Sequence, residues 1–114
     1  MRLPGRIPYH VAMQYALTGD MMTAERAAQF GLVNELVEPG QALAGALKLA
    51  RAILANGPLA VQVSKRIVAE SRDWTEAEMF DRQAPIAAPV FETEDAKEGS
   101  RAFAEKRAPV WTGR

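Results

Sequence analysis

The sequence contains no cysteine among its 114 residues. This absence excludes disulfide bonds, thiolate nucleophiles and the common structural zinc sites. A cysteine-free chain is compatible with a reducing compartment, and we expect a cytoplasmic protein.

Charge of one sign and long apolar runs are also lacking. Lys and Arg total 14, Asp and Glu total 14, and no run of like charges occurs. This balance argues against a nucleic-acid partner, including a helical DNA-binding domain. The longest nearly apolar stretch, 41–55, is interrupted by Lys48 and Arg51 and falls short of the ~20 residues that span a bilayer. We therefore expect no membrane partner.

Residues for independent chemistry are scarce. The only histidine is His10, and no acidic or hydroxyl residue near it in sequence forms an obvious relay. One histidine and no cysteine predict no metal site, and the isolated glycines do not form a phosphate-binding loop. Carboxylates do recur in pairs, as at Glu76 and Glu78 or Glu94 and Glu98. Their positions in predicted first helical turns favour capping and helix-dipole roles over acid–base catalysis.

Proline and glycine divide the chain into short helices, so the fold class is mainly α with one short extended segment. We treat residues 1–114 as a single region, with a helix–helix–strand part at about 1–40 and a helical assembly part at about 41–114. Pro85 and Pro89 should kink or break the helix that Thr75 starts. The elements expected are helices at 8–19, 24–30, 41–56, 58–71, 75 onward and 94–107, a strand or extended segment at 32–37, and a hairpin of the helices 41–56 and 58–71.

The last predicted helix carries the most informative surface. Phe103, Lys106 and Arg107 recur at spacings of three and four, so a ring and one or two cations share a face at its C-terminal end. A ligand with an adenine-like ring and phosphates could pack on the ring and meet the lysine. The structural alternative places Phe103 in the core and leaves Lys106 solvated and favoured by the helix dipole.

These residues lie inside a longer motif. Residues 94–109 contain an acidic pair, Glu-Gly, Phe and Glu-Lys-Arg, an order that resembles the closing signature of the enoyl-CoA hydratase/isomerase (crotonase) family. Three further segments, 2–19, 23–37 and 56–65, resemble that family in the family's order. The resemblance implies the C-terminal helical portion of a crotonase-like fold, without the N-terminal β/α spiral.

The resemblance also implies a division of function. The family acts on acyl-CoA thioesters and builds its oxyanion hole and catalytic glutamates upstream of the position matched by Arg2, so it assigns no catalytic residue here. We expect the chain alone to be inactive, since oxyanion-hole donors supply a large electrostatic contribution. The C-terminal helices would pack a homo-oligomer, a trimer or dimer of trimers, and reach a neighbouring CoA site through Phe103, Lys106 and Phe91.

Several alternatives stay open. No cofactor is expected, because the CoA thioester is the substrate. The motifs do not separate hydratases from isomerases or identify the acyl chain. A truncated product, a split gene or a deliberate cut would each explain why the match begins at Met1. A non-catalytic helical oligomerisation module, or a degenerate fragment, remains the competing hypothesis.

Overall fold

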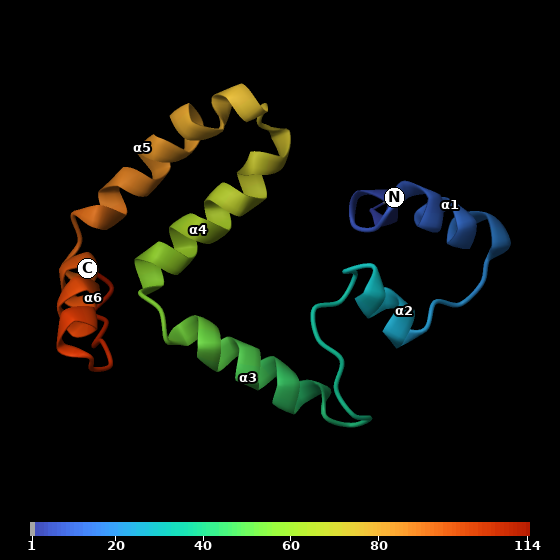
Figure 1. The fold of residues 1–114 in the computed structure, drawn as a ribbon, viewed down its shortest axis with the longest axis horizontal. Coiled ribbons are helices and arrows are strands. Elements are labelled where there is room, and N and C mark those ends of the chain that lie inside the picture. Colours follow the sequence, from blue (N-terminus) through green and yellow to red (C-terminus); the bar gives the residue numbers. More distant parts are fainter. Residues whose placement is uncertain (1) are drawn as a thin grey trace. The chain divides into compact units, whose positions relative to one another are not determined.

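The computed structural model describes residues 2–114, so Met1, where the matched segment begins, lies outside the described residues. Within this range the regular elements are all helical (Figure 1). The elements are η1 (Leu3–Gly5), α1 (Tyr9–Thr18), α2 (Ala24–Gln29), α3 (Ala42–Leu54), α4 (Pro58–Glu70), η2 (Ser71–Asp73), η3 (Glu76–Glu78), α5 (Met79–Phe91) and α6 (Glu94–Glu105). The mainly α fold class is confirmed.

The described chain divides into two compact units, one ending at Leu47 and the other spanning Lys48–Arg114. In the first unit the core is small. It consists of Ile7, Val11 and Ala12, with partly buried side chains packed around them from Leu3, Tyr15, Met22 and Phe30. The guanidinium carbon of Arg26 also lies 4.3 Å from the centroid of the Phe30 ring, a cation–π contact that stabilises the end of α2.

Local capping signals set the ends of the first two helices as predicted. Gly19 follows α1 in the left-handed conformation at φ 71°, which a residue without a Cβ adopts at little cost. The Thr23 side chain accepts a 3.2 Å hydrogen bond from the backbone N–H of Arg26 and so caps α2.

The segment 32–37 contains no strand, so its prediction as a strand was wrong, and the bends at 32–34 do not support a continuous extended segment either. A strand needs a partner for its backbone groups, and no other strand exists among residues 2–114. The segment is instead fixed at both ends. The Leu32 N–H donates to the Ala27 carbonyl at 2.8 Å, and Val37 packs so closely on α3 that a Cβ on Gly45 would lie 2.9 Å from its methyl carbon.

In the second unit, α4 packs on α5 and α5 packs on α6. The predicted hairpin of helices 41–56 and 58–71 was therefore wrong, because α4 takes α5 as its principal partner. The corner between α3 and α4 is occupied by Trp111. Its indole N–H donates to the Ala55 carbonyl at 2.9 Å, and its ring lies 3.6 Å from where a Cβ on Gly57 would stand.

The helix α5 runs unbroken through Pro85 and Pro89. The prediction that these prolines would break the helix was therefore wrong. Each proline removes one N–H and leaves one carbonyl, four residues earlier, without its helical donor. Pro85 and Pro89 are both exposed, and positions four apart share one face, so water can reach the carbonyls they leave. A capping box at the preceding turn supports the helix start, with the Glu78 carboxylate accepting from the N–H and hydroxyl of Thr75.

Large apolar side chains remain outside the core. In the second unit the buried residues among those described are Gly57, Asp95 and Ala102, none of which has a large apolar side chain. None of the described helices is long and apolar enough to cross a bilayer. The apolar side chains exposed by more than two-thirds include Leu17, Met21, Leu43, Leu54, Val68, Phe80, Phe91, Phe103 and Val110. The second unit therefore lacks the large buried side chains that usually hold helices together.

The exposed prolines of α5 give a direct test of its stability. Replacing Pro89 with alanine restores a helical N–H and loses no buried contact, so we expect the free energy of unfolding to rise by about 2 kcal/mol. Urea denaturation followed by circular dichroism measures this change. As a control, Pro39→Ala alters an exposed proline outside the helices and should lower stability slightly. Equal effects of the two substitutions would contradict the account.

Candidate functional site

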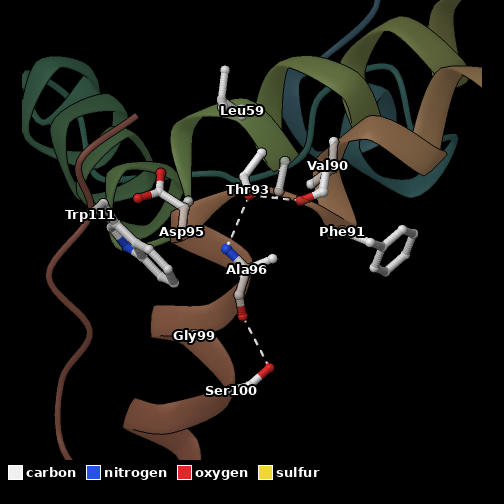
Figure 2. Close-up of a pocket in the computed structure, with 11 residues that line it drawn as sticks. Leu59, Val90, Phe91, Thr93, Asp95, Ala96, Gly99, Ser100 and Trp111 are labelled. Carbon is white, nitrogen blue, oxygen red and sulfur yellow. Dashed lines mark hydrogen bonds between the residues drawn. The ribbon is translucent and has the colours of Figure 1, made fainter. Parts of the chain in front are cut away.

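The helix α6 is built by local signals that the sequence displays. The Thr93 hydroxyl accepts a 3.1 Å hydrogen bond from the Ala96 N–H and donates to the Val90 carbonyl at 2.7 Å, which links the end of α5 to the start of α6 (Figure 2). Glu94 stands in the first turn and pairs with Lys97 at 2.7 Å. The predicted helix at 94–107 is thus confirmed over Glu94–Glu105.

The C-terminal end of α6 closes in a Schellman-type turn. Lys106 adopts the left-handed conformation at φ 54°, and its N–H lies 3.2 Å from the Phe103 carbonyl. The Arg107 N–H reaches back to the Ala102 carbonyl at 3.0 Å. These bonds satisfy carbonyl groups that the last helical turn leaves open, and they fix the backbone on both sides of Lys106.

The structure places the three predicted CoA contacts on the surface, but not together. Phe103 is 88% exposed, so the alternative that assigned it to the core of this chain does not hold. Lys106 is also exposed and follows Phe103 by three residues at the same end of α6. Phe91 is exposed at the end of α5, before α6 begins. It therefore lies near the opposite end of a helix about 18 Å long.

Two carboxylates of α6 hold the C-terminal tail. Asp95, only 5% exposed, accepts hydrogen bonds from the N–H and hydroxyl of Thr112 and from the N–H of Gly113 at 2.7–3.0 Å. Glu98 accepts from the Val110 N–H at 2.9 Å and from both terminal nitrogens of Arg107 at 2.6 and 3.0 Å. We refer to these contacts as the tail clamp. It gives backbone donors in an irregular segment the partners they require.

The tail clamp favours the ionised form of both carboxylates. The Arg107 guanidinium, followed by the Val110 N–H, lowers the pKa of Glu98 from 4.5 to about 2. Hydrogen bonding from the Thr112 N–H, more than any other cause, lowers the pKa of Asp95 despite the opposing effect of burial. In return, Glu98 and, to a smaller extent, Glu105 raise the pKa of the Arg107 guanidinium. Asp95 and Glu98 are therefore both anionic near neutral pH.

An apolar hollow of about 350 Å³ lies where α4, α5 and α6 meet. Figure 2 shows Trp111 and Phe91 on opposite sides of the first turns of α6. The Trp111 ring packs against Gly99, where an added Cβ would lie 3.3 Å from the indole. Phe91 lines this hollow, whereas Phe103 and Lys106 do not.

The described residues offer no independent catalytic site at His10 or around a metal ion. His10 is exposed on α1 and its side chain makes no hydrogen bond or ion pair with the described residues, which also contain no group of three His, Cys, Asp or Glu side chains that could hold a metal ion. Sequence reasoning missed the roles of Asp95, Glu98 and Trp111. The available signal was the aromatic residue in a short tail after a helix that carries carboxylates at spacing three.

Together, the helices and the exposed end of α6 define a class: an all-α segment with a pinned tail that presents an aromatic ring and a cation. The sequence profile of the enoyl-CoA hydratase/isomerase family matches residues 1–114. The chain belongs to this family, and it matches the C-terminal part of its members.

Individual relatives support the same assignment. The chain is 49% identical over 114 residues to enoyl-CoA hydratase EchA19 of Mycobacterium tuberculosis, covering 100% of this chain and 43% of the relative. It is 39% identical over 117 residues to carnitinyl-CoA dehydratase of Salmonella arizonae, covering 99% and 45%. A crystal structure of an enoyl-CoA hydratase from M. tuberculosis H37Rv superposes with a TM-score of 0.94 at 59% identity, covering 99% and 45%. The chain thus spans less than half the length of these relatives.

The tail clamp predicts a stability that depends on acid. Because the pKa of Glu98 is lower in the folded state than its ordinary 4.5, its contribution is present above pH 4.5 and is lost as the pH falls toward about 2. We expect the thermal midpoint to fall across this window, and less steeply in Glu98→Gln. Glu78 also has its pKa lowered to about 2, first by the Thr75 hydroxyl, so Glu78→Gln serves as the comparison outside the tail. Only the Glu98 substitution should change the fluorescence of Trp111, measured in a Trp74→Phe background.

The Trp111 anchor can be tested by separating its hydrogen bond from its packing. Trp111→Phe removes the bond to the Ala55 carbonyl and should cost about 1 kcal/mol, whereas Trp111→Ala also removes the ring and should cost about 3 kcal/mol. Gly99→Leu should expel the ring, while Ala104→Leu on the exposed side of α6 should not. Denaturant unfolding and indole fluorescence report both effects. A stability of Gly99→Leu equal to that of Ala104→Leu would contradict the assigned contact.

Proposed function

We propose that this chain is the C-terminal segment of a protein that acts on acyl-CoA thioesters, and that it contributes oligomer packing and a CoA contact. The observation that carries the proposal is the end of α6, where Phe103 is 88% exposed and the Lys106 ammonium has no ion-pair partner among the described residues. An exposed ring next to an unpaired cation suits a ligand that joins an aromatic base to phosphates.

The packing part of the proposal is supported by the apolar side chains left uncovered. On α3, Leu43 and Leu54 are exposed by 72% and 76%, and on α5 Phe80 is exposed by 77%. Side chains of this size usually lie in a core or an interface. We propose that a homo-oligomer, a trimer or dimer of trimers as the family resemblance implies, covers these faces.

The proposal also states that this chain alone is not catalytic. No described residue forms a set of oxyanion donors with a general base, and the family's own set is expected upstream of Arg2. We therefore propose that the chain alone does not turn over an enoyl-CoA, and that the reaction, hydration or double-bond migration, needs the matching N-terminal half. The protein would act in the cytoplasm, with CoA thioesters as substrates and no separate cofactor.

The contact with CoA can be tested by calorimetry on the chain mixed with the N-terminal half of EchA19 from M. tuberculosis. Lys106→Ala removes a charge-assisted contact and should weaken CoA binding about tenfold, because such a contact contributes roughly 1.5 kcal/mol. Phe103→Ala should weaken it by a similar factor. The matched control is Lys65→Ala, which removes an exposed lysine from α4. Equal affinities for wild type and Lys106→Ala would exclude the phosphate contact.

A non-catalytic helical interaction module is the second candidate, favoured by the scarcity of independent chemistry in the chain. It shares the exposed apolar faces with the first proposal but predicts no role for Lys106. In the same calorimetric experiment this module would assemble with its partner and show no CoA binding in either wild type or variant.

A further inference from the structure

Lys106 stands in a conformation that its residue type disfavours. Among the described residues it is the only one other than glycine with a positive φ, at 54°. The left-handed region crowds a Cβ against the backbone, and for this reason glycine dominates the position that follows a helix. A lysine held there is a backbone outlier of the kind that suggests a functional constraint.

Glu98 is the residue that joins both sides of this turn. From the middle of α6 its carboxylate accepts the fork of Arg107, directly after Lys106, and also the N–H of Val110. The Glu98 side chain is only 17% exposed, so the pair is partly shielded from water. Two parallel N–H···O bonds to one carboxylate fix the direction of a guanidinium as well as its distance.

The Lys106 ammonium, which lies next to these fixed residues, has no partner in the part of the chain that the structure describes. Lys97 pairs with Glu94, and Arg107 pairs with Glu98 and Glu105, whereas the side chain of Lys106 makes no ion pair or hydrogen bond within residues 2–114. The turn therefore neutralises the arginine and leaves the adjacent ammonium available. Its left-handed backbone sets the direction in which the Cα–Cβ bond leaves the chain.

We infer that Glu98 is a positioning residue for Lys106: through Arg107 and Val110 it fixes the left-handed turn that presents the lysine ammonium to the phosphates of CoA. This inference rests on the proposed CoA contact. In this inference Glu98 and Arg107 hold the turn, and Lys106 contacts the ligand.

The first experiment measures the turn without any ligand. The Cα and Cβ chemical shifts of residue 106 report a left-handed backbone, and we expect Glu98→Gln to move them toward ordinary helical or coil values. Glu105→Gln is the matched control, because Glu105 contacts Arg107 at Nε alone and does not touch the tail. Arg107→Lys provides a second variant, since it keeps the charge and loses the fork. Circular dichroism confirms that each variant is folded.

The second experiment measures CoA binding in the mixed complex described above. We expect Glu98→Gln and Arg107→Lys to weaken CoA binding about fivefold with Lys106 intact, and Glu105→Gln to leave it unchanged. Lys106→Gly should give opposite signs in two readouts: a thermal midpoint about 4 °C higher, because glycine relieves the left-handed cost, and CoA binding about tenfold weaker.

The outcomes separate the inference from the proposal on which it rests. If Lys106→Ala binds CoA as wild type does, the CoA contact itself fails. If Lys106→Ala weakens binding while Glu98→Gln and Arg107→Lys change neither affinity nor the shifts of residue 106, the contact stands and the positioning role of Glu98 is overturned. A lower thermal midpoint for Lys106→Gly would contradict the cost assigned to its backbone.

Discussion

The order of the C-terminal part of this chain depends on two carboxylates that lie one turn apart on α6. Asp95 and Glu98 receive the backbone N–H groups of a tail that has no helix or sheet to satisfy them. Charge-assisted bonds of this kind are stronger than neutral ones, and the buried position of Asp95 makes its loss from the network more costly. Once the tail is fixed, Trp111 is placed over Gly99 and Gly57, and α6 is thereby tied to the start of α4.

This polar network matters because the apolar core is so thin. Most large apolar side chains of α3 and α5 are exposed, and in the second unit Ala102 is the only buried hydrophobic side chain among the described residues. The surface ion pairs contribute little, since exposed pairs of this kind are each worth less than about 1 kcal/mol. Helix order in the second unit therefore relies on the helix caps, the tail clamp and the Trp111 indole.

The sequence predicted the features that are decided within a few residues. The caps at Thr23 and Thr93 and the glycine after α1 each act over three or four positions, and the structure has them as expected. The strand at 32–37 failed because β-branched residues alone do not supply a partner strand. The prediction of a break at Pro85 was wrong because the proline is exposed, so water can hydrogen-bond to the carbonyl that loses its helical donor. The roles of Asp95 and Glu98 were hidden because their partners lie 9 to 18 residues away in the sequence.

The closing motif of the family can now be divided by physical role. Asp95, Glu98 and Arg107 hold the tail and the last turn, and Gly99 leaves space for the indole. Phe103 does none of this, because its side chain is exposed and free of the core. The same stretch matches both an enoyl-CoA hydratase and a carnitinyl-CoA dehydratase, so the residues that hold the tail and the last turn do not by themselves distinguish one reaction from another.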